Sequence, residues 1–189
     1  YAQKDDWFAA ADIADAFMNL GLKPHNWANV AINIQLDGSN ADLAYCRLAF
    51  GLRSAVRIFQ GVAELILRIL RRRCAAIAHQ IRFDMSYIDD SACVASTFKT
   101  ASTWLRNWKT LMLDLGMPWQ ESKIVPPTRL IELLGIMVCS RTLTMYVHKS
   151  RVEKALQLME AFEQRPRLTL KQTQSIMGHL NFIAQVVRF

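Results

Sequence analysis

The chain has 189 residues, 52% of them hydrophobic, so it can bury a core and is not a disordered protein. Its formal net charge of +7 is typical of proteins that meet nucleic acid, although a basic surface can also serve solubility alone. The most apolar helical segment contains Glu64 and Arg68, which excludes a membrane span there.

Strand and helix patterns alternate along the first half of the chain. A buried strand ends near Asp12 and turns into a helix, and two later strands flank the sequence DGSN (Asp37–Asn40), which favours a hairpin turn. A long helical pattern with one apolar side follows. In chain order, the expected elements are residues 7–12, 29–36, 41–48 and 54–79.

The second half continues this alternation and ends in helices. Two strands flank the pair Asp89–Asp90, and Thr97 and Gly116 are suited to begin and end the next helix. Pro126–Pro127 is expected in a loop, and Thr169 is expected to cap the last helix. In chain order, the expected elements are residues 81–88, 91–96, 97–115, short strands within 121–140 and 142–147, and helices at 149–164 and 170–187. This order predicts an α+β fold, with helices on one face of an antiparallel sheet.

The cysteines indicate an intracellular protein. None of the four forms a CxxC pair, and no histidine lies at zinc-ligand spacing from them. We expect buried free thiols in a reducing compartment, with nucleus and cytoplasm not distinguished. The four are Cys46, Cys74, Cys93 and Cys139.

Two adjacent acids, Asp89 and Asp90, lie between two predicted strands that consist mainly of apolar or small residues. One interpretation is an ordinary exposed hairpin tip. The other adds Asp12, which ends an earlier strand and faces the pair if the two strands are neighbours. Three carboxylates at one sheet edge repel one another unless cations compensate them, and oxygen ligands without His or Cys select Mg²⁺ or Mn²⁺. Two such ions can promote nucleotidyl transfer.

Five sequence blocks resemble, in order and spacing, the successive motifs of reverse transcriptases. They are DIADAF (12–17), FGLRSAVRIFQ (50–60), YIDD (87–90), ESK (121–123) and LLG (133–135). The C-terminal sequence LTLKQTQSIMGHLNFIAQVVR resembles the thumb of DIRS and Ngaro retrotransposon polymerases, which carry a tyrosine recombinase. The resemblance implies a palm of ferredoxin- or RRM-like topology at residues 1–147 and thumb helices at 148–189. On this resemblance the fingers would be missing, and we expect them either upstream in a longer polyprotein or lost. We therefore expect the 189 residues alone to polymerise poorly or not at all.

The resemblance also implies roles for individual residues. The metal-binding groups would be Asp12, Asp89, Asp90 and the carbonyl of Ile13, and Lys123 would protonate pyrophosphate; as an alternative, Lys123 is an exposed loop residue. Phe17 would exclude a ribose 2′-hydroxyl, or it is a core residue. The other nucleotide-binding positions are Asp15, Ala16, Gly51 and Arg53, and the primer grip is Leu134, Gly135 and Ile136. The family usually has a small residue at Arg53 and a proline at Val56, so Arg53 would hold a template phosphate or crowd the nucleotide.

Basic residues gather in two stretches. Six arginines and one acid lie between Arg53 and Arg73, and eight Lys or Arg and three Glu lie from Ser140 onward. The C-terminal stretch is predicted to track a nucleic-acid backbone, or it is a solvated helix face. The residues predicted to contact the backbone are Lys149, Arg151, Lys154 and Lys171.

The function that this resemblance implies is RNA-directed DNA polymerase. It would use two Mg²⁺ ions, with Mn²⁺ as a possible substitute, and its partners would be an RNA template, a DNA primer or hybrid duplex, and deoxynucleoside triphosphates. A second hypothesis is a non-catalytic, domesticated module that binds RNA or builds an assembly. A third is a cyclase-like or primase-like nucleotidyl transferase, which the block at residues 50–60 does not support.

Overall fold

A computed structural model of the protein describes residues 2–36, 39–163 and 167–186. The chain divides into two compact units. Unit 1 contains Trp7–Pro127, and unit 2 contains Ala2–Asp6 and Thr128–Phe189. The division falls at Pro127, whereas the sequence predicted a boundary at residue 147, so the last three strands group with the C-terminal helices. The assignment of palm and thumb stays a prediction.

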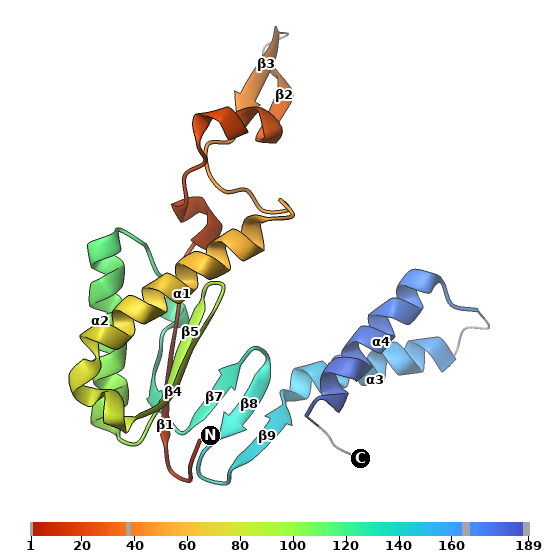
Figure 1. Ribbon diagram of the computed structural model, residues 1–189. Coiled ribbons are helices and arrows are strands. Elements are labelled where there is room, and N and C mark those ends of the chain that lie inside the picture. The colour runs from red at the N-terminus through yellow and green to blue at the C-terminus, as the bar shows by residue number, and fades with distance from the viewer. Residues whose placement is uncertain (1, 37–38, 164–166, 187–189) are drawn as a thin grey trace. The chain divides into compact units, whose positions relative to one another are not determined.

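Unit 1 is built on a four-stranded sheet in the order β4-β5-β1-β6 (Figure 1). Strand β5 is antiparallel to both β1 and β4. Edge strand β6 contains Pro126 and Pro127, which the sequence analysis placed wrongly in a loop; an edge position tolerates a residue that lacks an N–H. The strand bounds are β1 (Trp7–Asp12), β4 (Ile81–Tyr87), β5 (Asp90–Ala95) and β6 (Val125–Thr128).

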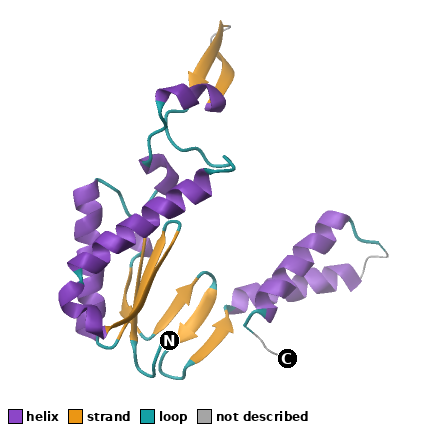
Figure 2. Cartoon of the chain, in the orientation of Figure 1, coloured by secondary structure: helices purple, strands orange, loops and turns teal. Residues whose placement is uncertain are grey.

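Two long helices, α1 (Ala55–Arg73) and α2 (Phe98–Leu115), cover one face of this sheet (Figure 2). Ala9 and Ala11 of β1, together with Ile13 just after the strand, join the helices in one buried cluster. Because side chains alternate across a strand, the even-numbered residues of β1 lie on the opposite face. Asp12 therefore lies on the face that the helices leave uncovered.

The predicted limits of α2 are confirmed. The hydroxyl of Thr97 accepts a hydrogen bond from the N–H of Thr100 at 3.1 Å, which satisfies a donor of the first turn. Gly116 ends the helix at φ 63, a left-handed conformation that glycine adopts without strain. Both caps were recognisable because they use local chemistry alone.

Unit 1 also contains a hairpin of β2 (Ala31–Leu36) and β3 (Ser39–Ala44), as predicted. The predicted turn includes Asp37 and Gly38, which lie outside the described residues. Short 3₁₀ turns connect the larger elements: η1 (Ala16–Asn19), η2 (Pro24–Val30), η3 (Ala75–Gln80) and η4 (Glu121–Lys123). The cysteine prediction holds for Cys74 and Cys93, which are buried, but Cys46 is exposed and Cys139 is half-buried.

Unit 2 combines a three-stranded antiparallel sheet with two helices. Thr169 caps the second helix in a reciprocal capping box with Gln172, as its position in the sequence predicted. The bounds are β7 (Leu130–Leu133), β8 (Ile136–Cys139), β9 (Thr144–Val147), α3 (Lys149–Glu163) and α4 (Leu170–Ala184).

The fold class is α+β, which confirms the prediction from the sequence. Antiparallel strands form the sheets of both units, and helices cover the sheet of unit 1. Within the described part of the chain, every helix is too short or too polar to cross a lipid bilayer.

Candidate active site

The register of the central strands brings two predicted carboxylates together. Asp12 is the last residue of β1 and lies directly opposite Asp90, the first residue of β5. Directly opposite residues in an antiparallel pair project from the same face. Asp12 is 6% exposed, whereas Asp90 is exposed. Asp89 precedes Asp90 in the turn and is half-buried.

The turn between β4 and β5 has a strained backbone. Ile88 has φ 54, a left-handed conformation that is costly for a β-branched residue. The side chain of Gln60 on α1 holds this turn on both sides: its Oε1 accepts the N–H of Ile88 at 2.8 Å, and its Nε2 donates to the carbonyl of Ser86 at 3.2 Å. Gln60 lies within a block quoted for the resemblance, but sequence reasoning gave it no role.

Backbone hydrogen bonds tie the end of β1 to its neighbours. The N–H of Ile13 donates to the carbonyl of Asp89 at 3.0 Å, and the N–H of Ala14 donates to the carbonyl of Pro118 at 2.9 Å. The ammonium of Lys123 donates to Oδ2 of Asp12 at 3.1 Å. Three distant parts of the sequence therefore meet around Asp12.

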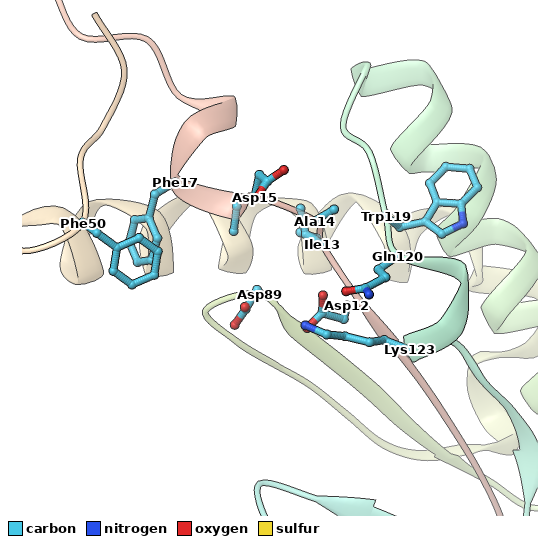
Figure 3. A pocket seen from close by; sticks show the side chains of 11 residues that line it. Asp12, Ile13, Ala14, Asp15, Phe17, Phe50, Asp89, Trp119, Gln120 and Lys123 are labelled. Atoms are coloured by element: carbon cyan, nitrogen blue, oxygen red, sulfur yellow. The ribbon is translucent and has the colours of Figure 1, made fainter. Parts of the chain in front are cut away.

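The end of β1, the β4–β5 turn and Lys123 border a cavity of about 430 Å³. In Figure 3, Asp12, Asp89 and Lys123 lie together, and Phe17 and Phe50 lie apart from them. The predicted residues that line the cavity are Asp12, Ile13, Asp15, Ala16, Phe17, Asp89 and Lys123. Ala14, Phe50, Trp119 and Gln120 also line it, although sequence reasoning assigned them no role. Asp90, Gly51 and Arg53 are not among its lining residues.

Charge in the site is uneven. The pKa of Asp90 is raised above its ordinary value, first by partial removal from water and then by repulsion from Asp89 and Asp12, while Lys123 opposes the shift. The pKa of Lys123 is also raised, mainly by its hydrogen bond to Asp12. Lys123 is therefore an ammonium at neutral pH and carries a proton close to the carboxylates.

The donors in the site suit a hard divalent cation. Oδ1 of Asp12 is buried and has no hydrogen-bond partner, whereas Oδ2 accepts a hydrogen bond from Lys123, so one carboxylate oxygen is left for a further ligand. The neighbouring donors are carboxylate oxygens, which Mg²⁺ and Mn²⁺ prefer. In the arrangement observed, however, no three His, Cys, Asp or Glu side chains among the described residues are close enough together to form a metal-binding group.

Phe17 is a core residue that also lines the cavity, and its predicted role against a ribose 2′-hydroxyl stays a prediction. It is 5% exposed and belongs to the core, where its ring packs against Phe50 at 4.7 Å and Phe59 at 5.4 Å between centroids. It also lines the cavity. Ala16 is buried beside it, and Asp15 is exposed at φ 48 in the turn that joins β1 to these residues.

Gly51 and Arg53 are exposed on the approach to α1. Gly51 has φ 89, which favours glycine, and a Cβ placed there would meet nothing within 4 Å. The structure thus explains Gly51 by its backbone conformation. Its predicted role beside a base pair stays a prediction, as does the role of Arg53.

A polar network beside the cavity was not predicted. The carboxylate of Glu121 accepts the indole N–H of Trp119 at 2.6 Å and the ammonium of Lys109 at 2.5 Å. The two hydrogen bonds, that from Lys109 first, lower the pKa of Glu121. The indole of Trp119 also packs edge-on against the buried Trp108, so the loop that leads to Lys123 is attached to α2.

The predicted primer-grip residues form a tight turn in unit 2. Leu134 and Gly135 connect β7 to β8 with φ 50 and 83, and Ile136 begins β8. The guanidinium of Arg151 lies against this turn, because a Cβ on Gly135 would stand 2.6 Å from its Nη2. Arg151 also lies 4.7 Å from the ring centroid of Phe182. Arg151 thus has intramolecular partners, and its predicted contact with nucleic acid stays a prediction.

The other three residues predicted to contact a nucleic-acid backbone are exposed. Lys149 pairs with Glu153 at 3.3 Å within α3, and Lys154 and Lys171 carry exposed ammonium groups. Exposure is compatible with backbone contacts and equally with a solvated helix face.

Comparison with known proteins defines the fold. No protein-family model and no curated protein matches the sequence. The solved structures that match include three of a foamy viral protease-reverse transcriptase: with an RNA/DNA hybrid (TM-score 0.71, 20% identity), with double-stranded DNA (0.69, 17%), and its dRH form with double-stranded DNA (0.71, 17%). Each comparison covers 96% of this chain, but only 21%, 34% and 28% of the respective viral chains. The chain therefore has a reverse-transcriptase-like fold.

Proposed function

We propose that the chain is the palm and thumb of an RNA-directed DNA polymerase. The observation that carries this proposal is the meeting of Asp12, Asp89 and Asp90 at one end of the sheet, with the Asp12 side chain partly unsatisfied beside a cavity. The reverse-transcriptase-like fold supports it. The viral structures contain DNA or an RNA/DNA hybrid, which supports a nucleic-acid partner for this chain as well.

In the proposed reaction, the 3′-oxygen of a DNA primer bonds to the α-phosphorus of a deoxynucleoside triphosphate. The proton of the 3′-hydroxyl passes to solvent, and the bond from that phosphorus to the pyrophosphate oxygen breaks. Asp12, Asp89, Asp90 and the carbonyl of Ile13 would hold two Mg²⁺ or Mn²⁺ ions, which activate the hydroxyl and stabilise the leaving group when bound. Lys123 would release Asp12 and donate its proton to the departing pyrophosphate.

Phe17 would select the sugar of the nucleotide, since its ring is fixed by core packing and also borders the cavity. Phe17→Ala should raise the ratio of ribonucleotide to deoxynucleotide addition by tenfold or more, on the order of the discrimination that one polar or steric contact provides. This ratio is insensitive to the fraction of protein that is folded. An unchanged ratio would leave Phe17 as a core residue only.

The proposal extends to the source of the chain and to its partners. The C-terminal resemblance supports a retrotransposon of the DIRS or Ngaro type, an intracellular setting and a longer polyprotein. The RNA template would lie along the site, and Leu134, Gly135 and Ile136 would hold the primer end. A reading frame for a tyrosine recombinase in the same element would support this origin, and a retroviral-type integrase in its place would contradict it.

A non-catalytic RNA-binding or assembly module is the second candidate. It is favoured by the ion pair between Lys123 and Asp12, and by the described acids not standing in a metal-binding arrangement. On this interpretation, the ion pair replaces the cations and the carboxylates are relics. Such a protein would bind a primer-template without extending it.

Primer extension separates the two candidates. The longest available form of the protein that contains these 189 residues is given a labelled DNA primer on an RNA template, one deoxynucleotide, and Mg²⁺ or Mn²⁺. We expect addition by the wild type and a loss of about a hundredfold or more for Asp12→Asn and for the double variant Asp89→Asn with Asp90→Asn. Asp42→Asn on β3 is the isosteric control and should retain activity. Tight binding of the hybrid without any addition would favour the non-catalytic module.

A further inference from the structure

The outer face of α1 carries arginines that the site does not use. Arg57, Arg68 and Arg72 are exposed, and Arg53 precedes the helix. At about 100° per residue, Arg57, Arg68 and Arg72 lie within about 60° of the helix circumference. The buried residues Phe59, Ala63, Ile66 and Leu70 centre on the opposite side. We call Arg53, Arg57, Arg68 and Arg72 the α1 arginine stripe. These arginines face solvent rather than the core.

Two neighbouring arginines of α1 form ion pairs that explain their presence, whereas, among the described residues, the arginines of the stripe do not. Arg71 binds Asp84 at 2.7 Å, and Arg73 binds Asp114 at 2.7 Å. Within the part of the chain that the structure describes, Arg57, Arg68 and Arg72 form no side-chain hydrogen bond or ion pair. The stripe is therefore not needed to hold α1 against its neighbours.

The charge of the stripe is only partly offset. Glu64 is the single acid between Arg53 and Arg73, and its carboxylate accepts a hydrogen bond from Gln60 at 3.5 Å. Along the helix axis, roughly 16 Å separates Arg57 from Arg68 and roughly 6 Å separates Arg68 from Arg72. A line of unpaired cations of this length suits an extended polyanion better than a single phosphate.

The surroundings of the stripe favour a single nucleic-acid strand. Phe50, which is 82% exposed and lines the cavity, lies just before Arg53 in the chain. Ile58 and Leu65 are exposed on one flank of the stripe. Single-strand sites combine cations that follow the backbone with rings on which bases stack, and a paired duplex would leave these apolar groups without a partner.

We propose that the α1 arginine stripe binds the backbone of a single-stranded nucleic acid that extends from the cavity along the outside of α1. The helix itself is labelled in Figure 1. Naming that strand as the template rests on the proposed function, whereas its binding does not. The stripe would hold the strand outside the reaction site, with Arg68 and Arg72 farthest from the cavity. Loss of polymerase activity in other variants therefore leaves this inference untouched.

The test measures binding of a labelled single-stranded RNA of about 20 nucleotides by fluorescence anisotropy across a range of salt concentrations. The full chain is compared with the double variant Arg68→Gln with Arg72→Gln. Removing two contacts should weaken binding and flatten the slope of log K against log salt by about 1.4, at about 0.7 per contact. The matched control, Lys99→Gln with Arg106→Gln, removes the same charge from exposed positions on α2 and should change the slope less than half as much.

Two further measurements test whether the variants remain folded and whether the stripe binds other polyanions. Arg68→Lys with Arg72→Lys should restore the salt slope, because it restores the charge, and circular dichroism checks that each variant keeps its helices. Vesicles of phosphatidylserine and phosphatidylcholine test for an anionic membrane. Equal slopes for the glutamine variant and the α2 control, failure of lysine to restore the slope, or an equal dependence of vesicle binding on the stripe would each overturn the inference.

Discussion

Units 1 and 2 differ in how much of their apolar surface they bury. The main core cluster lies entirely within unit 1, where Trp104 and Trp108 are fully buried between the helices and the sheet. In unit 2, Ala155 is the only buried residue of α3, and no described residue of α4 is buried. Leu170, which begins α4, is 74% exposed.

The proposed roles of residues in the two units therefore rest on different kinds of evidence. The carboxylates of unit 1 are positioned by a packed core and by specific hydrogen bonds, so their geometry supports a chemical argument. The basic residues of unit 2 lie on helices that bury little, so their proposed nucleic-acid contacts rest on charge alone. Substitutions that compare the two units test whether this contrast is real.

Truncating a core tryptophan should produce the largest effect. Trp108→Ala should lower the free energy of unfolding of unit 1 by about 3–5 kcal/mol, because it removes a fully buried ring. Phe182→Ala in α4 should cost less, since Phe182 is half-exposed. Denaturant unfolding followed by tryptophan fluorescence reports unit 1, which contains all five tryptophans, and circular dichroism includes the helices of unit 2.

Trp108→Phe is the control for this comparison. Its ring still fills most of the site, and it removes an indole N–H that has no hydrogen-bond partner. It should therefore cost much less than Trp108→Ala. Similar losses for Trp108→Ala and Phe182→Ala would show that the two units are not packed as differently as the structure indicates.

Removing Gln60 tests the hydrogen bonds that position the carboxylate turn. Gln60→Ala should destabilise unit 1 by about 1–3 kcal/mol, because the Ile88 N–H and the Ser86 carbonyl lose their partner. Amide hydrogen exchange at Ile88 should accelerate. Arg57→Gln, at an exposed position of the same helix, should leave both quantities unchanged. If Ile88 stayed protected in Gln60→Ala, the turn would be held by something else.

The β7–β8 turn in unit 2 offers a stabilising change. Leu134→Asn should raise the stability of unit 2 by about 1 kcal/mol, because Asn-Gly suits a turn with two positive φ angles better than Leu-Gly does. Gly135→Ala should lower the stability of unit 2, because position 135 has φ 83 and the added Cβ would approach the guanidinium of Arg151. Thermal melting followed by circular dichroism measures both. A stabilising Gly135→Ala would contradict the observed turn.

The smallest effect concerns the charge of Asp90. Because the folded state raises the pKa of Asp90, its ionised form opposes folding, and this cost appears as pH rises above the ordinary value of 3.8. Asp90→Asn should therefore raise Tm by roughly 1–2 °C at pH 7 in metal-free buffer, as expected for an exposed position. The gain should disappear in strong acid. A lower Tm at pH 7 would contradict this sign.

Much of the fold was predictable because it depends on local patterns. The strands around Asp12 and Asp90 have short apolar runs, and Thr97, Gly116 and Thr169 limit helices through chemistry within one turn. The pairing of β1 with β5 needed only the assumption that the two strands are neighbours. The carboxylate cluster followed from that assumption together with the motif resemblance.

Other features depend on tertiary contacts that no local pattern encodes. Gln60 is a polar residue in a helix, and nothing nearby in the sequence indicates that it reaches a hairpin 28 residues later. The edge position of β6 explains why Pro126 and Pro127 can lie in a strand. The contacts of Arg151 with Gly135 and Phe182 were not predicted, and its contact with nucleic acid stays a prediction.

Binding of Mn²⁺ tests the central claim most directly. Electron paramagnetic resonance of free Mn²⁺ measures binding to the wild type, Asp12→Asn, Asp89→Asn and the control Asp42→Asn, each with a primer-template and a deoxynucleoside triphosphate present. We predict that the wild type and Asp42→Asn bind Mn²⁺, and that Asp12→Asn and Asp89→Asn bind it at least about tenfold more weakly. Equal binding by all four proteins, or none by the wild type, would contradict a metal site at the end of β1.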